Sequence, residues 1–230
     1  MPINETYRTW IRRICELRPK QRKTQVQNFV WLLVGIFHSR SVSLSKIAGK
    51  VLSTAKNVST VRRLSRFLAS SAVDVRSWYR ATAKTWLMSQ TQQAGEIRLI
   101  VDGSKVGFGH QLLMVSLAYR RRAIPIAWTW VRHIRGHSTA TKQIVLLKYI
   151  RSLIPQNIPV FLVGDSEFGS IAVLQQLKQW RWFFVLRQKG NTGLWLDERT
   201  GWQRLDGLVR QAGQSAWRPN GYLTQSDIFP

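Results

Sequence analysis

The stretch FLVGDSEFGS, residues 161–170, places apolar residues directly before Asp165 and then breaks into a turn. Its apolar start is typical of a buried strand, and the Gly and Ser residues that follow indicate a turn. A second stretch, IRLIVDGSKVG at 97–107, ends its own apolar run on Asp102. Two apolar strands that each end on a carboxylate are the pattern from which both a fold and a site can be predicted.

The segment after residue 95 contains five runs with the length and the β-branched or aromatic content of strands. Two stretches between these runs, 138–154 and 171–180, have helical spacing. The first begins with the candidate N-caps Ser138 and Thr139 and the second directly follows Ser170, so the order is β-β-β-α-β-α-β. Strands joined by short turns favour an antiparallel meander, and strands joined through a helix favour parallel crossovers. The predicted fold is therefore α/β, a mixed sheet with flanking helices. The five runs are IRLIVDG (97–103), QLLMVSLAY (111–119), AIPIAWTWV (123–131), IPVFLVGD (158–165) and WFFVLRQ (182–188).

Each of the two helical stretches is expected to bury one broad apolar face, because its apolar residues are spaced three or four apart. The expected members are Ile144, Leu147, Ile150 and Ile154 in the first helix, and Ile171, Leu174, Leu177 and Trp180 in the second.

Residues 1–94 have a helical pattern, and a domain boundary is expected near 91–96. Two helices, about 43–52 and 59–69, are expected to be joined by a turn near residue 56. The second would carry Arg62, Arg63 and Arg66 opposite Val61, Leu64 and Leu68, as in a helix that lies against DNA. A helical hairpin with a solvated basic face is the alternative.

The net charge of the chain points to a polyanionic partner. Lys and Arg number 35 against 11 Asp and Glu, which gives +24. Residues 1–96 hold 17 basic and 4 acidic residues and residues 97–230 hold 18 and 7, so the excess is not confined to a tail. Such a balance favours binding to phosphates, with nucleic acid first and a generally basic surface as the alternative.

A cytoplasmic chain without a membrane partner is expected. The lone Cys15 excludes an intrachain disulfide, and the N-terminus lacks the apolar region of a secretory signal. The longest apolar run, FVWLLVGIF at 29–37, is nine residues, whereas a membrane span needs about 20.

The two carboxylates suggest metal chemistry only as a pair. Alone, Asp102 before Gly is common in hairpin turns and Asp165 before Ser is common at helix starts. On neighbouring central strands they could converge on one divalent ion, since carboxylate oxygens are ligands that Mg²⁺ prefers. Two such ions would activate the attacking oxygen and stabilise the leaving one in phosphoryl transfer. A basic protein with such a site would be a nuclease or a strand-transfer enzyme.

Three stretches, LIVDGSKV, IPIAWTWV and VFLVGDSEFGSIAVLQQLKQWRWFFVLRQKGN, resemble the catalytic core of DDE transposases of the insertion-sequence-4-like group. The resemblance covers about residues 97–208. It implies an RNase-H-like fold, Asp102 and Asp165 as the first two catalytic acids, and Mg²⁺ or Mn²⁺ as the cofactor. It also implies a helical DNA-binding region at 1–94, the first part of the catalytic core at 95–190, and the start of an inserted β-rich segment at 191–230.

The sequence departs from that group at the third catalytic acid, a Glu within a Tyr-x-x-Arg-x-x-x-Glu-x-x-x-x-x-x-Lys pattern that is absent here. Glu167 could replace it only if the turn after Asp165 folded back. The chain is therefore expected to be the N-terminal portion of a transposase, with an incomplete RNase-H-like sheet and no activity alone. A non-catalytic DNA-binding protein or an inhibitor that competes for transposon ends is the alternative. The remaining late acids, Asp197, Glu198, Asp206 and Asp227, are expected to be solvated.

The expected partner is double-stranded DNA, either transposon ends or target DNA, and a homodimer is the candidate assembly. The run YRRR at 119–122 is interpreted as a charged hairpin tip, with phosphate contact by Arg120, Arg121 and Arg122 as its functional alternative. His133 and His137 are four residues apart but lack further ligands at metal-site spacing.

Overall fold

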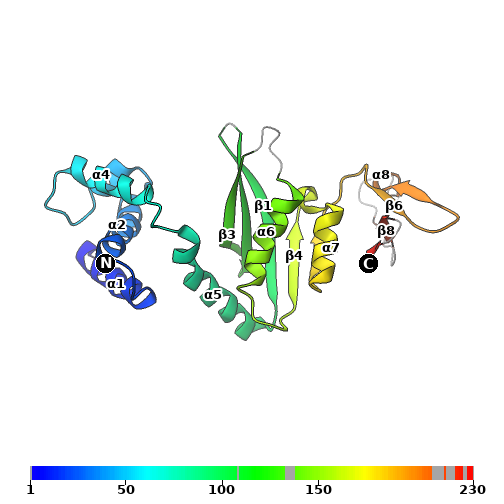
Figure 1. Ribbon diagram of the computed structural model, residues 1–230, viewed down its shortest axis with the longest axis horizontal. Coiled ribbons are helices and arrows are strands. Elements are labelled where there is room, and N and C mark those ends of the chain that lie inside the picture. Colours follow the sequence, from blue (N-terminus) through cyan, green and yellow to red (C-terminus); the bar gives the residue numbers. More distant parts are fainter. Residues whose placement is uncertain are drawn as a thin grey trace. The chain divides into compact units, whose positions relative to one another are not determined.

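The computed structural model describes residues 2–107, 109–132, 138–208, 215, 221–224 and 227–229. His133 and His137 lie outside these ranges. The chain divides into two compact units, 1–81 and 82–230, and the division falls inside helix α5 (Val75–Ala94) (Figure 1). None of the helices within the described ranges has the length and apolar content needed to cross a membrane.

The first unit contains α1 (Ile3–Leu17), α2 (Lys23–Ser39), α3 (Leu44–Ala48), α4 (Asn57–Leu68) and the start of α5. The buried side of α4 consists of Thr60, Leu64 and Phe67, which follow the helical period. Leu68, expected to be on this side, is 59% exposed because Phe67 occupies the core position. One core cluster is formed by Trp31, Leu32, Ile47, Leu64 and Phe67, and a second by Ile14, Val26, Val30 and Val34.

Close packing of α3 on α2 depends on Gly35. A Cβ at this position would lie 2.5 Å from Cγ2 of Ile47, which is too close for any side chain. The connection between the two predicted helices is longer than predicted, because α3 ends at Ala48 and α4 begins at Asn57. Both predicted helices exist, and the first is shorter than predicted.

The second unit contains a five-stranded sheet in the order β3-β2-β1-β4-β5. β1 pairs antiparallel with β2, and β2 with β3, whereas β4 lies parallel to both β1 and β5. This strand order and these directions are those of an RNase-H-like sheet, as expected. The strands are β1 (Ile97–Val106), β2 (His110–Tyr119), β3 (Arg122–Arg132), β4 (Val160–Gly164) and β5 (Phe183–Leu186).

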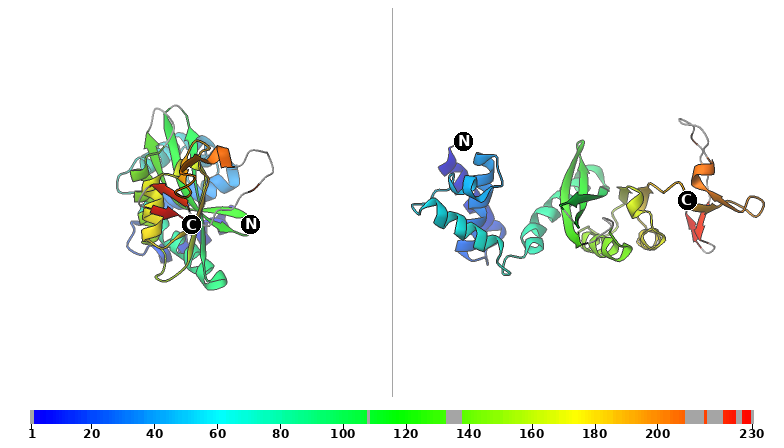
Figure 2. Two further views of the ribbon diagram at one scale, coloured as in Figure 1. Left: turned by 90° about the vertical axis from the view of Figure 1, so that its right-hand side faces the viewer. Right: turned by 90° about the horizontal axis from the view of Figure 1, so that it is seen from above.

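Two helices, α6 (Ala140–Arg151) and α7 (Ile171–Gln179), lie on one face of this sheet (Figures 1 and 2). The two helices bury Leu147, Ile150, Leu174 and Leu177, as predicted. Ile171, also expected to be buried, is 39% exposed. Gln143 and Leu146 of α6 and Val173 of α7 are buried instead of Ile144 and Ile171.

The chain continues into a smaller sheet of order β7-β6-β8-β9. Its elements are β6 (Gly193–Trp195), β7 (Trp202–Arg204), α8 (Leu205–Leu208), β8 (Gly221–Thr224) and β9 (Asp227–Phe229). All of its strands are three or four residues long.

Candidate active site

The parallel pairing of β1 with β4 brings Asp102 and Asp165 together. Val101 is paired with Gly164 at the end of this register, and each aspartate is the next residue. Both aspartates are exposed. β1 and β4 are inner strands of the sheet, so the two carboxylates lie on neighbouring central strands and not at opposite edges.

The two aspartates occupy the face of the sheet that α6 and α7 leave open. A Cβ on Gly164 would lie 2.7 Å from Cγ1 of Val101 and 3.3 Å from Cδ2 of the buried Phe168, so this pair faces the covered side. Successive residues of a strand point to opposite faces. Asp102 and Asp165 therefore both point to the open side.

Asp102 does not form a hairpin turn, which corrects the structural alternative for this residue. β1 continues to Val106 because its antiparallel pairing with β2 extends to that residue. The pairing of β1 with β4 ends earlier, at Val101. Asp102 is thus the first residue of β1 beyond its pairing with β4, inside a strand and not at the strand end that the sequence suggested.

Asp165 also has the capping role that its sequence context suggested. Its Oδ1 accepts a hydrogen bond from the backbone N–H of Glu167 at 3.0 Å and caps the short 3₁₀ helix η1 (Ser166–Phe168). Phe168, at the end of this helix, is fully buried. The cap and the buried ring together fix the backbone that carries Asp165.

Glu167, the residue that could complete the pair only by a fold-back of the turn, points away from the two aspartates. Its Oε2 would lie 2.9 Å from a Cβ on Gly103, a residue that alternates with Asp102 and faces the other side of β1. The Glu167 carboxylate accepts hydrogen bonds from Gln111 Nε2 at 2.8 and 3.1 Å, and from the backbone N–H of Ser138 at 2.6 Å and its hydroxyl at 2.5 Å. It is bound on the covered side of the sheet.

Gln143 of α6 completes this polar network. Its Nε2 donates to the Ser138 hydroxyl at 2.9 Å and to the Glu167 carbonyl oxygen at 3.1 Å. Gln111 and Gln143 are both 2% exposed. The network therefore joins β2, the segment before α6 and the turn after Asp165, and sequence reasoning missed it because its members have no common motif.

Two of the other late acids, Asp206 and Asp197, form hydrogen bonds of their own. Asp206 accepts hydrogen bonds from Arg204 Nε at 3.0 Å and Nη2 at 2.5 Å. The hydrogen bond from Arg204 lowers the pKa of the Asp206 carboxyl below its usual value. Asp197 Oδ1 accepts hydrogen bonds from the backbone N–H groups of Arg199 and Thr200. These residues belong to the smaller sheet and its turns; the side chain of Asp227 lies outside the described parts.

A pocket of about 400 Å³ lies beside Asp165. Ser138, Glu167, Gln188 and Lys189 are among its lining residues, and Asp102 is not. Gly169 lies against Gln188, whose amide would be 2.3 Å from a Cβ at that position. The segment after β5 therefore lies close against the turn that follows Asp165.

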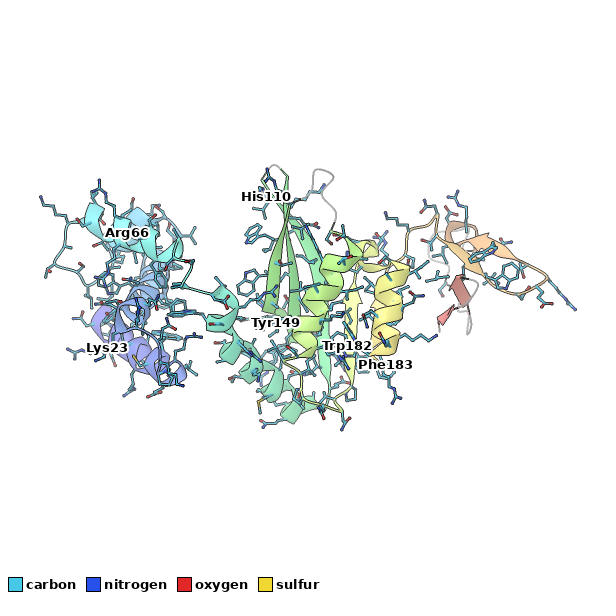
Figure 3. The ribbon with its side chains drawn as sticks, in the orientation of Figure 1. Lys23, Arg66, His110, Tyr149, Trp182 and Phe183 are labelled. Atoms are coloured by element: carbon cyan, nitrogen blue, oxygen red, sulfur yellow. The ribbon has the colours of Figure 1, made fainter. Side chains whose placement is uncertain are left out.

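The predicted DNA-contacting arginines of α4 fall into two classes. Arg62 and Arg66 are exposed (Figure 3 labels Arg66). The Arg63 guanidinium instead lies 4.3 Å from the ring centroid of Trp31. It also donates to Asn28 Oδ1 and Gln27 Oε1, both at 2.7 Å. Arg63 therefore attaches α4 to α2.

Arg120, Arg121 and Arg122 lie at the tip of the β2–β3 hairpin, as the sequence indicated, and are exposed. Arg120 and Arg121 form a two-residue turn with φ of 44° and 62°. Positive φ at both central residues is characteristic of a type I′ turn, in which Asn and Gly are preferred. This tip presents arginines in a conformation that costs them energy.

The carboxylate pair fits part of a Mg²⁺ or Mn²⁺ site. Its oxygens are hard ligands, and Mg²⁺ commonly takes one or two carboxylates and completes its shell with water and phosphate. Across the described ranges, no three His, Cys, Asp or Glu side chains come together as a metal-binding group. Asp102 and Asp165 would supply two anionic ligands to such an ion.

Comparison with solved structures finds transposases at low identity. The catalytic domain of Mos1 mariner transposase is 13% identical with a TM-score of 0.30, and the Mos1 catalytic domain with raltegravir and Mn is 14% identical with a TM-score of 0.29. Each alignment covers 46% of this chain and 57% of the other. The piggyBac transposase synaptic complex with hairpin DNA is 13% identical with a TM-score of 0.36, over 80% of this chain and 47% of the other.

This chain therefore aligns with about half the length of these transposases. No protein-family model matches the sequence, and no curated protein matches it. The assignment of the fold rests on the strand order and pairing described above.

Proposed function

We propose that this chain is part of a DDE transposase of the insertion-sequence-4-like group, acting on double-stranded DNA at transposon ends. The observation that carries the proposal is the placement of Asp102 and Asp165 on adjacent central strands and on the same open face. The resemblance of the sequence and the net charge of +24 support it. The parent reaction would be hydrolysis of a phosphodiester followed by attack of the freed 3′ hydroxyl on target DNA.

Asp102 and Asp165 would be the metal ligands contributed by this chain. A divalent ion supplies charge stabilisation at the attacking and leaving oxygens of phosphoryl transfer. Asp165 would be oriented by its own cap on Glu167 N–H, and Glu167 by Gln111 and Ser138. The position of one ligand would thus depend on the polar network on the opposite face of the sheet.

A second candidate function is non-catalytic DNA binding, including competition for transposon ends. It is favoured by the binding of Glu167 on the covered face, which leaves two carboxylates on the open face among the described acids. Under this proposal the chain binds DNA through Arg62, Arg66 and the hairpin arginines and does not cut it.

Metal titration tests the assignment of the carboxylates. The chain should bind Mn²⁺, followed by electron paramagnetic resonance, and Asp102→Asn and Asp165→Asn should each weaken this binding at least tenfold. Asn keeps the size of the side chain and an oxygen for the cap at Asp165. Glu198→Gln, at an exposed acid in the segment between β6 and β7, is the matched control. Unchanged Mn²⁺ affinity in both aspartate variants would refute the site.

DNA titration at increasing salt tests the electrostatic part. If about six phosphates are neutralised, affinity for duplex DNA should fall roughly 10³-fold between 50 and 200 mM salt. A flat response would exclude binding driven by the net charge of the chain.

A further inference from the structure

A second pocket, of about 800 Å³, lies at the other end of β4 from the aspartates. Val160, the first residue of β4, and Phe183, the first of β5, line it, whereas Asp165 follows the last residue of β4. A strand rises about 3.3 Å per residue, so this pocket and the carboxylates are separated by roughly 16 Å along the strand. The pocket is thus a feature distinct from the candidate active site.

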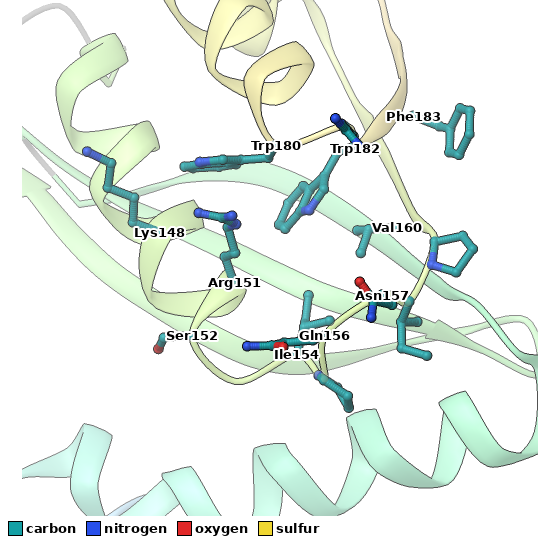
Figure 4. Close-up of a pocket in the computed structure, with 14 residues that line it drawn as sticks. Lys148, Arg151, Ser152, Ile154, Gln156, Asn157, Val160, Trp180, Trp182 and Phe183 are labelled. Atoms are coloured by element: carbon teal, nitrogen blue, oxygen red, sulfur yellow. The ribbon is translucent and has the colours of Figure 1, made fainter.

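The pocket is both basic and aromatic. Lys148 and Arg151 extend from α6, Trp180, Arg181 and Trp182 follow α7, and Phe183 begins β5 (Figure 4). The remaining described lining residues are Ser152, Ile154, Pro155, Gln156, Asn157, Ile158, Pro159 and Val160. Among the described residues that line it there is no Asp or Glu. Three cations therefore face the pocket with no anionic side chain from its walls.

One of the cations contacts one of the aromatic rings directly. The Arg151 guanidinium lies 5.4 Å from the ring centroid of Trp180. The rings of Trp180 and Trp182 are 5.3 Å apart at an angle of 57°. Trp180 is half-buried, so part of its ring is accessible beside the positive charges, whereas the Phe183 ring stacks on Phe161 and points away from them.

Helix electrostatics explain only part of this arrangement. Lys148 and Arg151 lie in the last turn of α6, where cations are favoured by the helix dipole. Arg181 also lies beside a helix C-terminus, that of α7, but its backbone takes a left-handed φ of 58° there. Its N–H donates to the Lys178 carbonyl and that of Trp182 to the Leu177 carbonyl, a helix ending in which glycine ordinarily takes the left-handed position.

We propose that this pocket binds a nucleotide unit of a single-stranded nucleic acid, with its base against the aromatic side chain of Trp180. The phosphate would be bound by Lys148, Arg151 and Arg181, and the amides of Gln156 and Asn157 are available to the edge of the base. Alternating cations and aromatic rings are the recognition chemistry of single strands, in which bases stack and phosphates pair with basic residues. The volume suits a ligand of this size.

This site goes beyond the proposed transposase function and needs neither Asp102 nor Asp165. Binding of single strands here and metal binding at the aspartates would be lost in different variants, so the failure of one proposal leaves the other open to its own test.

The test is binding of a short fluorescent oligothymidylate to the whole chain, followed by anisotropy. Arg181→Gly removes the cation and installs the residue that the backbone favours, so the variant should resist heat at least as well as the original chain. We expect its affinity for the single strand to fall about tenfold or more. Trp180→Leu should weaken binding about 5- to 100-fold.

Lys142→Gln is the matched control, because it removes one exposed cation from the other end of α6; its affinity should change less than twofold. An abasic strand of equal length should bind the original chain more weakly than oligothymidylate, and thymidine monophosphate should compete only at much higher nucleotide concentration. Variants at Arg181 and Trp180 that bind like the control would overturn the site. If the abasic strand binds as tightly as oligothymidylate, base stacking is overturned. If thymidine monophosphate competes at the same nucleotide concentration as the oligonucleotide, the assignment to a strand is overturned. If the variants at Arg181 and Trp180 lose duplex binding as much as single-strand binding, selectivity for single strands is overturned.

Discussion

The guanidinium of Arg63 lies 4.3 Å from the ring centroid of Trp31, so an arginine on the basic side of α4 is part of the interior contacts of the first unit. Its hydrogen bonds to Asn28 and Gln27 add to this contact. The DNA-binding proposal for α4 is therefore carried by Arg62 and Arg66, and the three arginines should respond differently to substitution.

Arg63→Ala is expected to lower the free energy of unfolding by about 1–3 kcal/mol, because a cation–π contact and two charge-assisted hydrogen bonds are lost. Arg62→Ala and Arg66→Ala should change it by less than about 0.5 kcal/mol, and each should reduce the salt slope of DNA binding by about 1. Urea unfolding and DNA titration at several salt concentrations measure both quantities. Equal stability of all three variants would contradict the interior role of Arg63.

The β2–β3 hairpin offers a substitution that should raise stability while weakening DNA binding. Replacing Arg120 by Asn and Arg121 by Gly supplies the residues that a type I′ turn prefers. The gain is expected to be about 1 kcal/mol, since left-handed backbone costs about 1–2 kcal/mol per residue and the contact of Arg120 with the Tyr119 ring is lost. Arg122→Gln should weaken DNA binding without the gain in stability. Thermal unfolding separates the two, and unchanged DNA affinity in both variants would exclude phosphate contact by this tip.

The Glu167 network is expected to contribute to stability. Glu167→Ala would leave the buried Gln111 Nε2 without its carboxylate, and an unsatisfied buried donor costs about 1–3 kcal/mol. Glu198→Ala, an exposed acid of the same type, should cost less than about 0.5 kcal/mol. Tryptophan fluorescence in urea measures the difference. Equal stability of the two variants would show that the hydrogen bonds of Glu167 are energetically neutral.

The chain alone is expected to bind supercoiled plasmid without nicking it in Mg²⁺ or Mn²⁺. Two carboxylates supply fewer anionic ligands than the three of the family pattern, and a loss of about 4 kcal/mol in transition-state stabilisation lowers the rate about a thousandfold. Gel analysis of plasmid and of candidate end sequences measures nicking. Nicking that disappears in both Asp102→Ala and Asp165→Ala would show that another residue completes the site, and Glu167 would be substituted next.

The open face of the sheet should limit solubility. Val185 is 72% exposed and is paired with Val163, which is 47% exposed. Val185→Lys should reduce aggregation without loss of stability, because a charge on an edge strand opposes association. Leu186→Lys, one residue on, would place a charge beside Gly164 on the covered face and should destabilise the chain by about 2 kcal/mol or more. Light scattering and thermal unfolding measure the two effects, and equal aggregation of the original chain and Val185→Lys would contradict this view of the open face.

The order of strands and helices along residues 97–188, and the antiparallel or parallel connections between them, could be predicted because each run is short, apolar and bounded by clear turns. The position of each strand within the sheet was implied only by the family resemblance. The buried faces of α6 and α7 were predicted only in part. The predicted sets place successive apolar residues three apart, and three residues turn the helix about 60° less than a full turn. The first residue of each set, Ile144 or Ile171, is therefore rotated away from the buried face. Gln143 and Val173 take those places.

Side-chain partners between distant segments could not be predicted. In the sequence, Arg63 cannot be distinguished from an exposed arginine. Its contacts with Gln27, Asn28 and Trp31 depend on the packing of α4 against α2. Likewise Gln111 and Glu167 belong to unrelated stretches, and only the packing of β1 over the turn after β4 joins them. The pair of aspartates was predictable because both lie on one backbone register, which needs no knowledge of side-chain contacts.

The pairing of β1 with β4 also has a consequence for the order of folding. β1, β2 and β3 are joined by short turns, whereas β2, β3 and α6 lie between β1 and β4 in the sequence. Contacts between distant segments form more slowly than local ones, because the loop must close before they are gained. The meander can therefore assemble while Asp165 is still far from Asp102, and the two aspartates become neighbours only when β4 docks on β1.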